Sequence, residues 1–351
     1  MNKAKKMSLG PVLIGIASTH LSQAEKILLG HPAVGGVVLF SRNIESATQV
    51  SALCTDIRAQ REARLLITVD QEGGRVQRLR EGFTRLPALR SIGKMYASDP
   101  DQARDYAYRH GRVMATEVLD LGIDLSFAPV VDLDCGSCVI ADRSLGNNAE
   151  QVIELSRAYI AGMADAGMQA CGKHYPGHGS VELDSHLDDV IDRRSAEEIL
   201  STDLKPFAAL STRLASIMVA HVTYPAVDRQ PAGYSSRWLK QILREEIAYS
   251  GVIISDDLDM FAACNVGDML VRVELALASG CDLVLICKAE SAAEYLQQAD
   301  NNFADVSMLI QQLYGRSLVS REDAEKVSEY RQWVTTLEML QAADASTAKV
   351  S

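Results

Sequence analysis

Residues 64–70 read RLLITVD, a short apolar run with β-branched side chains that ends in an acid, Asp70. A continuous apolar run of this length is typical of a strand that is covered on both faces. Runs of the same kind recur along the chain and are separated by longer stretches with helical periodicity. The eight runs are residues 11–18, 34–40, 64–70, 123–132, 169–174, 216–221, 251–256 and 281–287.

The alternation of these runs with helical stretches predicts parallel strands joined by crossover helices. Helices are predicted over residues 46–60, 101–121, 149–166, 196–214 and 236–248, and a polar helical region follows about residue 301. Most strand runs end in a polar side chain, and in a closed barrel those ends share the face that carries the active site. We therefore predict a single (β/α)8 TIM-type barrel of the α/β class, in preference to a doubly wound open sheet.

The chain contains neither an internal repeat nor a linker that would divide it. We expect residues 1–340 to form one catalytic barrel with C-terminal helices and residues 341–351 to form a disordered tail. Two connections, residues 71–93 and 175–194, are too long for simple turns. Long loops on a rigid scaffold tend to carry function, so both are candidates for the site.

The composition is that of an ordinary globular protein, with 351 residues, 47% hydrophobic and 23% charged residues and a net charge of -11. This charge disfavours a nucleic-acid or anionic-membrane partner and favours a neutral substrate. The seven scattered cysteines indicate thiols in a reducing compartment, so we expect a cytoplasmic protein. Cys135 and Cys138 form a CxxC pair, but no second pair accompanies them, and we predict neither a metal site nor a redox role.

Lysines precede a short apolar stretch at the N-terminus, an arrangement that superficially matches a signal peptide. Gly10, Pro11 and Gly15 interrupt the stretch, and no persuasive cleavage site follows it. We interpret it as the first strand. No segment approaches the roughly 20 consecutive apolar residues that span a bilayer, so no membrane segment is predicted.

The densest group of polar side chains is KHYPGHG, residues 173–179, followed by the triplet Asp184-Ser185-His186. Lys173 and His174 end a strand run, where their donors could hold hydroxyl groups of a ligand. Asp184 and His186, two residues apart, form a candidate dyad in which the carboxylate orients the imidazole. Spacing alone favours a structural or surface role for His186.

Two more groups follow strand runs. In the motif SDDL, residues 255–258, Asp256 directly ends the run and should face the barrel mouth as a nucleophile or base, whereas Asp257 is the better candidate for a cap. Asp70 begins DQEGGRVQR, and its ionised carboxylate can accept from two adjacent hydroxyls. Arg78 and Arg143 are ambiguous on their own, since each can pair with an acidic neighbour or reach a ligand.

Taken together, these motifs resemble glycoside hydrolase family 3. KHYPGHG, DSH, SDDL and VDQEGGRVQR are the stretches that carry the similarity, which runs from about residue 10 to about residue 335. Within the family, the chain is similar to the single-domain bacterial β-N-acetylglucosaminidases, which are β-hexosaminidases. It departs from the expected pattern at Tyr175, where phenylalanine is usual, and at Asp259, where a small polar residue is usual.

The resemblance implies a retaining enzyme that removes terminal β-1,4-linked N-acetylglucosamine from peptidoglycan fragments, with or without a peptide, in cell-wall recycling. Asp256 matches the nucleophile, and His186 matches the general acid/base, with Asp184 as its dyad partner. The positions that match those holding the sugar ring and its acetamido group are Asp70, Arg78, Arg143, Lys173 and His174. The mechanism needs no metal and no other cofactor. We expect a monomer or weak dimer whose partner is the muropeptide substrate.

Three alternatives remain open at this stage. Family 3 also contains β-glucosidases and enzymes that transfer the sugar to phosphate. Lys173 at a strand end could instead form the Schiff base of an aldolase, which would leave Asp256 without a role. A non-catalytic sugar-binding barrel is the third alternative, and the presence of both a nucleophile and an acid/base argues against it.

Overall fold

The computed structural model describes residues 8–181, 190–300 and 303–347. Its centre is an 8-stranded sheet in which every pairing is parallel. Each strand coincides with one of the eight predicted runs, apart from one residue at the ends of β7 and β9. The strands are β1 (Val12–Gly15), β2 (Val34–Leu39), β3 (Leu66–Val69), β6 (Leu125–Ser126), β7 (Cys171–Tyr175), β8 (Ser216–Val219), β9 (Val252–Asp257) and β10 (Leu283–Ile286).

The strand order is β6-β3-β2-β1-β10-β9-β8-β7, which leaves β6 and β7 to be joined. The chain directly after β6 makes this joint. The Cys171 amide donates to the Ala128 carbonyl at 2.8 Å, and the Val131 amide donates to the Lys173 carbonyl at 2.9 Å. The sheet is therefore a nearly closed (β/α)8 barrel of the TIM type, which confirms the predicted fold class and rules out the doubly wound open sheet.

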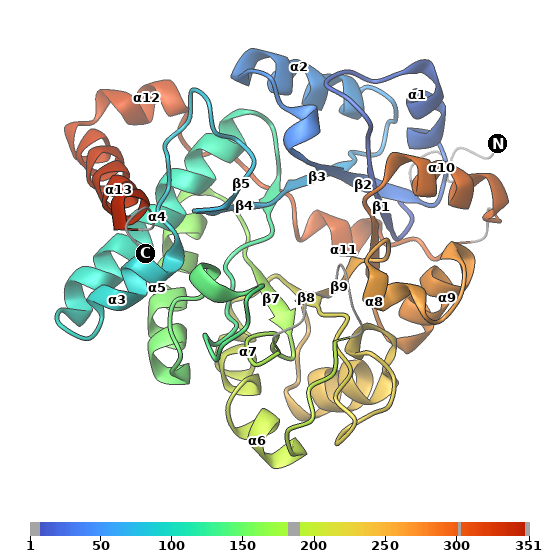
Figure 1. The fold of residues 1–351 in the computed structure, drawn as a ribbon. Helices are drawn as coiled ribbons and strands as arrows, with labels where there is room; N and C mark the ends of the chain where they lie inside the picture. The colour runs from blue at the N-terminus through green and yellow to red at the C-terminus, as the bar shows by residue number, and fades with distance from the viewer. Residues whose placement is uncertain (1–7, 182–189, 301–302, 348–351) are drawn as a thin grey trace.

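Helices surround the strands on the outside of the barrel (Figure 1). Ser46 caps the start of α2 by accepting from the Gln49 amide, and Asn148 caps α5 by accepting from the Gln151 amide. The predicted helices over residues 46–60, 101–121, 149–166 and 236–248 are confirmed. The helices are α1 (Gln23–Leu29), α2 (Ala47–Arg58), α3 (Leu89–Met95), α4 (Pro100–Asp120), α5 (Ala149–Ala166), α6 (Ala196–Ser201), α7 (Leu204–Leu210), α8 (Phe261–Cys264), α9 (Met269–Ser279), α10 (Ala289–Gln298), α11 (Ser307–Gln311), α12 (Arg321–Lys326) and α13 (Ser328–Thr347), with short η2 (Ser41–Asn43), η3 (Ala141–Arg143), η4 (Ala232–Tyr234) and the π-helix η5 (Arg237–Glu246).

The prediction of one helix over residues 196–214 is wrong, because the segment breaks into α6 and α7. Thr202 leaves the helical region, with φ -123° and ψ -78°. Pro206 explains the break, since it has no amide hydrogen to donate to the carbonyl of Thr202 four residues earlier. Asp203 stands at the break and accepts from Arg194 Nη1 at 2.8 Å.

The long connection after β3 contains an antiparallel hairpin, β4 (Gln71–Gly73) and β5 (Val76–Gln77), followed by α3. Gly73 and Gly74 make its turn with φ of +102° and +54°, values that non-glycine residues rarely adopt. The Gln71 side chain fixes the hairpin, because its Oε1 accepts from the amides of Arg78 and Leu79, both at 3.0 Å. The hairpin is therefore a rigid extension of β3 over the barrel mouth.

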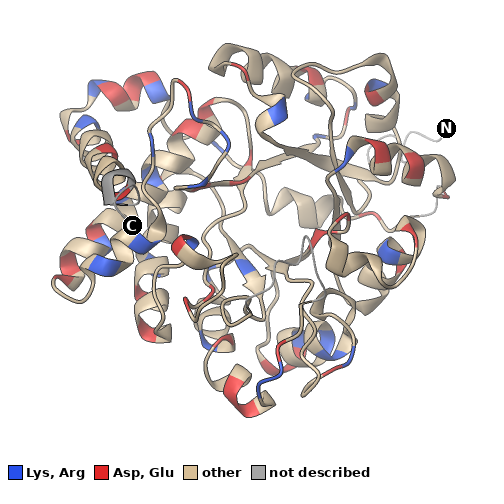
Figure 2. Ribbon diagram, in the orientation of Figure 1, with Lys and Arg blue, Asp and Glu red and all other residues tan. Residues whose placement is uncertain are grey.

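The C-terminal helices α12 and α13 lie beside α4, on the left in Figure 1. Trp333 of α13 packs edge-on against Tyr108 of α4, with ring centroids 6.0 Å apart. Figure 2 shows acidic and basic residues distributed over the outer helices rather than gathered in one patch of a single sign. None of the helices in the described part of the chain has both the length and the apolar character needed to cross a bilayer.

Tyr175 stands where phenylalanine is usual in the family pattern. Its side chain is fully buried between β7 and the outer helices α7 and η5. Its ring packs edge-on against Phe207 and Trp238, and its hydroxyl donates to the Trp238 carbonyl at 3.0 Å. The hydroxyl therefore ties β7 to the start of η5 without facing the barrel mouth.

We expect Tyr175→Phe to keep the ring packing but to remove this buried hydrogen bond. The free energy of unfolding should fall by about 1 kcal/mol, as measured by urea denaturation. An exposed matched substitution, Met308→Leu, should have little effect, since Met308 is 71% exposed. A Tyr175→Phe protein as stable as the wild type would contradict the proposed contribution of the hydroxyl.

Candidate active site

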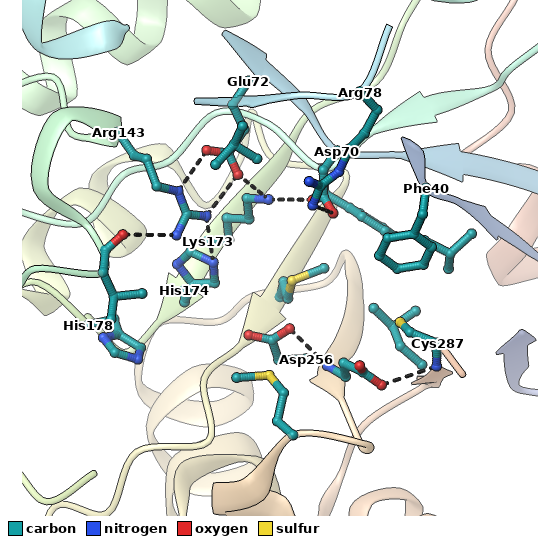
Figure 3. A pocket seen from close by; sticks show the side chains of 18 of the residues that line it. Phe40, Asp70, Glu72, Arg78, Arg143, Lys173, His174, His178, Asp256 and Cys287 are labelled. Atoms are coloured by element: carbon teal, nitrogen blue, oxygen red, sulfur yellow. Dashed lines mark hydrogen bonds and ion pairs between the residues drawn. The ribbon is translucent and has the colours of Figure 1, made fainter. Parts of the chain in front are cut away.

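A cavity of about 270 Å³ opens at the carboxyl ends of the barrel strands. Side chains from β3, the hairpin, β7 and β9 meet in it (Figure 3). This position matches the rule that the active sites of such barrels lie at the carboxyl ends of the strands. The polar and charged residues that line it are Asp70, Glu72, Arg75, Arg78, Arg143, Lys173, His174, His178, Asp256 and Asp257.

One wall of the cavity is a row of alternating charges centred on Lys173. The Lys173 Nζ lies 2.8 Å from Asp70 Oδ1 and 2.6 Å from Glu72 Oε1, and only 2% of its side chain is exposed. Burial alone would lower the pKa of Lys173, but Asp70 and Glu72 outweigh it and hold the pKa above its usual value. The lysine is therefore a buried ammonium ion held between two carboxylates.

Asp70 directly follows β3 and lines the cavity. Besides Lys173, it contacts Arg78, whose Nη2 lies 3.4 Å from Asp70 Oδ2. Burial would raise the pKa of Asp70, but Lys173 and Arg78 hold it below its usual value. Asp70 is thus ionised, and an ionised carboxylate can only accept hydrogen bonds.

Arg143, at the end of η3, makes a two-pronged ion pair with Glu72. Its Nε and Nη2 each lie 2.8 Å from one of the two Glu72 carboxylate oxygens. Against the effect of burial, Arg143 and Lys173 hold the pKa of Glu72 far below its usual value. Two parallel charge-assisted bonds fix the plane of the guanidinium as well as its position.

His174 follows Lys173 on β7 and is held by Asp132. The two side chains meet at 2.7 Å between Nδ1 and Asp132 Oδ2. The Asp132 carboxylate is ionised, since His174 keeps its pKa low despite burial, so Nδ1 carries the proton that it shares. The other nitrogen, Nε2, lies 3.3 Å from Arg143 Nη2 and accepts from it. His174 therefore supports Arg143 in this state of the site.

Asp256 lies across the cavity from this charged row (Figure 3). Its Oδ1 accepts from the Asp257 amide at 2.8 Å, and its carbonyl oxygen lies 3.2 Å from His221 Nε2. The neighbouring side chain, Asp257, accepts from the amides of Asp259 and Cys287 at 3.0 and 3.1 Å. Asp257 thus stabilises the turn, as the sequence predicted, and leaves Asp256 facing the cavity.

Residues 3–312 match the model of the glycosyl hydrolase family 3 N terminal domain. The chain belongs to glycosyl hydrolase family 3. It is 45% identical over 343 residues to the β-hexosaminidase of Alkalilimnicola ehrlichii, a match that covers 97% of this chain and 98% of that one. The chain is also 46% identical over 339 residues to the β-hexosaminidase of Pseudomonas aeruginosa, a match that covers 95% of this chain and 98% of that one.

A solved structure, that of native NagZ from Neisseria gonorrhoeae, matches the chain with a TM-score of 0.89 at 42% identity, and the match covers 95% of this chain and 98% of that one. The same bacterial protein has also been solved in complex with N-trifluoroacetyl-D-glucosamine, with a TM-score of 0.88 at 41% identity, covering 95% of this chain and 99% of that one. The chain is accordingly a family 3 glycoside hydrolase of the β-hexosaminidase type.

Six of the predicted site residues of this family 3 enzyme line the one cavity: Asp70, Arg78, Arg143, Lys173, His174 and Asp256. The other two, Asp184 and His186, lie outside the described residues. The described residues on either side of these two lie close together, because one hollow is lined by Ser180 and Val181 before them and by Val190 and Ile191 after them.

Two residues of the cluster, Glu72 and Asp132, were given no role in the sequence analysis. A usable signal for Glu72 was its place two residues after Asp70 in an extended segment, because alternate residues of a strand share a face. For Asp132 the signal was its position at the end of a strand run. Arg75, in contrast, pairs with Asp142 at 2.8 Å on the rim.

Within residues 8–181, 190–300 and 303–347, no three side chains of His, Cys, Asp or Glu group closely enough to hold a metal ion. Cys135 and Cys138 are exposed, and the seven cysteines, all in the described ranges, form no disulfide.

Burial, together with the charges of Asp259 and Asp256, raises the pKa of Asp257 to about 6, although two backbone amides act in the opposite direction. The native protein therefore keeps a proton there that the unfolded chain releases near pH 4. The contribution of this carboxyl to stability is present below about pH 4 and is lost as the pH rises through about 6.

We expect Asp257→Asn to abolish this loss, because an amide oxygen can still accept from Asp259 and Cys287. Relative to the wild type, the variant should gain about 2 kcal/mol in the free energy of unfolding between about pH 4 and pH 7, as measured by urea denaturation at each pH. Asp101→Asn, at a 90% exposed side chain, is the control. A difference between Asp257→Asn and wild type that does not change with pH would contradict this assignment.

Proposed function

We propose that the protein is a retaining exo-β-N-acetylglucosaminidase that removes terminal β-1,4-linked N-acetylglucosamine from peptidoglycan fragments during cell-wall recycling. The observation that carries the proposal is the division of the cavity, with Asp256 on one side and a row of hydrogen-bonding charges on the other. The similarity of the chain to NagZ from Neisseria gonorrhoeae, solved in complex with N-trifluoroacetyl-D-glucosamine, supports an N-acetylated sugar as the ligand.

In this proposal the charged row holds the sugar. Asp70 accepts from ring hydroxyls, and Arg78, Arg143 and Lys173 donate to hydroxyl or acetamido oxygens. His174 contributes by holding Arg143 at 3.3 Å. Polar groups held in fixed positions lose little entropy when a sugar binds, so they can orient the anomeric carbon toward Asp256.

The first chemical step forms a covalent intermediate. An Asp256 carboxylate oxygen attacks the anomeric carbon and forms a glycosyl ester, while the bond from that carbon to the leaving oxygen breaks. The protonated imidazole of His186 gives its proton to the leaving oxygen, so that the aglycone departs as a neutral alcohol. Asp184 stabilises the charged imidazole before the transfer.

The second step reverses the direction of proton transfer. The neutral imidazole of His186 takes a proton from water, the oxygen of that water attacks the anomeric carbon, and the ester bond to Asp256 breaks. Two displacements at one carbon retain the β configuration. A histidine suits both directions, because its unperturbed pKa lies near neutrality.

His178, which precedes Asp184 and His186 in the sequence, is a described residue that lines the cavity. Its amide donates to Asp132 Oδ1 at 2.8 Å, so the chain is anchored only a few residues before Asp184. Val190, after the segment, returns to the same hollow as Val181. This anchoring supports the proposal that the dyad serves this cavity.

The proposal is tested with an aryl β-N-acetylglucosaminide and the matching aryl β-glucoside. The wild type should cleave only the N-acetylated substrate. Asp256→Ala should lower kcat by roughly 10³-fold or more, because it removes the nucleophile. His186→Ala should lower it by about 10²-fold or more, with a smaller effect on substrates whose leaving group needs no proton.

The same assay in phosphate and in phosphate-free buffer separates hydrolysis from transfer to phosphate. N-acetylglucosamine as the product in both buffers supports hydrolysis. Tyr175→Phe is a suitable control, since its hydroxyl faces away from the cavity. Cleavage of neither substrate, or activity indifferent to Asp256, would refute the proposed mechanism.

A further inference from the structure

Glu72 is the most deeply placed acid of the cavity and has no role in the chemistry proposed above. Its side chain is 2% exposed, yet it lines the cavity. It lies in β4, where Gln71 points the other way and is fixed by the amides of Arg78 and Leu79. Strand alternation then directs Glu72 to the same face as Asp70.

Most of the donors of Arg143 are already used by contacts within the site, and Glu72 takes two of them. A guanidinium has five N–H groups. Glu72 takes two of them, at Nε and Nη2, His174 takes the second hydrogen of Nη2, and the Val139 carbonyl takes one at Nη1, 3.4 Å away. Among the described residues, one N–H of Nη1 is left without an acceptor.

Lys173 is restricted in the same way. An ammonium group has three N–H donors. One is directed to Asp70 at 2.8 Å and one to Glu72 at 2.6 Å. Within the described chain, a single N–H of Lys173 remains for a ligand.

The charge of Glu72 also determines how strongly Asp70 is held. With Glu72 present, Lys173 divides its attraction between two carboxylates. Without it, Asp70 would be the only carboxylate among the described residues in contact with Lys173 and Arg78, and none of the described carboxylates would contact the buried Arg143. Asp70 would then be drawn into ion pairing and less able to accept from a sugar hydroxyl.

We infer that Glu72 is the positioning residue of the sugar site: it aims one N–H of Arg143 and one of Lys173 into the cavity and leaves Asp70 available as an acceptor. Glu72 itself touches no substrate atom and takes part in no proton transfer. The inference rests on the proposed function, because it assumes that the sugar binds in this cavity.

The test compares Glu72→Ala with the wild type in KM, kcat and the Kd of N-acetylglucosamine measured by calorimetry. KM and Kd should both rise by at least about 10-fold, because the donors lose their fixed directions. Formate can enter the space left by the side chain, since Glu72 lines the cavity. Added formate should therefore recover part of the affinity, and sodium chloride of the same ionic strength should not.

Glu117→Ala is the matched control. Glu117 is also a 2% exposed carboxylate, but it accepts from the Thr84 side chain, outside the cavity. This variant should lose thermal stability without a change in KM, which separates a structural effect from a positioning effect.

Wild-type KM and Kd in Glu72→Ala, or an affinity that formate and chloride restore equally, would overturn the inference. If Glu72→Ala does not fold, Glu72→Asp replaces it: the shorter carboxylate keeps the charge but cannot reach both prongs of Arg143, so KM should still rise, and a wild-type KM would overturn the inference. A wild type that cleaves no aryl β-N-acetylglucosaminide would instead refute the proposed function.

Discussion

The ion pairs of Lys173 with Asp70 and Glu72 hold together the two sides of the barrel mouth. β6, which lies between β3 and β7, contributes only Leu125–Ser126 to the sheet. The backbone ladder is therefore thin at the place where the site is built. A buried ammonium is costly unless it is paired, and one of the two carboxylates that pair it directly follows β3 while the other lies in β4. The position of the charged row and the local integrity of the barrel thus depend on the same contacts.

This arrangement also divides the site into two chemically different walls. The wall on β3, β4 and β7 carries alternating charges whose donors and acceptors largely satisfy one another. The opposite wall holds Asp256, and the lining of the cavity also includes the apolar side chains Met218, Met260 and Leu285. In the proposed function, the charged wall would hold the ring, and apolar neighbours would strengthen electrostatic interactions near the reacting carbon. The proposed function therefore places binding and bond cleavage on separate walls of one cavity.

The fold could be predicted because the strands are covered on both faces and appear as continuous apolar runs. Closure of the barrel was less certain, because it depends on the backbone bonds of Ala128 and Val131 with β7, which no side-chain pattern reveals. The division of the helix at Thr202 was missed although Pro206 marks it. The hairpin β4–β5 was seen only as a long connection.

The site was predictable to the extent that single residues end strands. Asp70, Lys173, His174 and Asp256 stand at strand ends. Arg78 follows β5 and Arg143 ends η3, so neither lies at the end of a barrel strand, and both became candidates only through the family resemblance. Glu72 and Asp132 were not assigned, because their importance lies in the pairs that they form across the barrel. Such pairs are a property of the tertiary structure, and local spacing does not encode them.

The central claim is that Asp256 forms a covalent bond with the sugar. The direct measurement is mass spectrometry of the protein after incubation with a 5-fluoro N-acetylglucosaminyl fluoride, whose ring fluorine slows both displacements while the fluoride leaves readily. The account predicts a protein heavier by one sugar, with fragmentation locating the added mass on Asp256. A sugar attached to another residue, or turnover of the fluoride without any adduct while Asp256→Ala remains active, would contradict it.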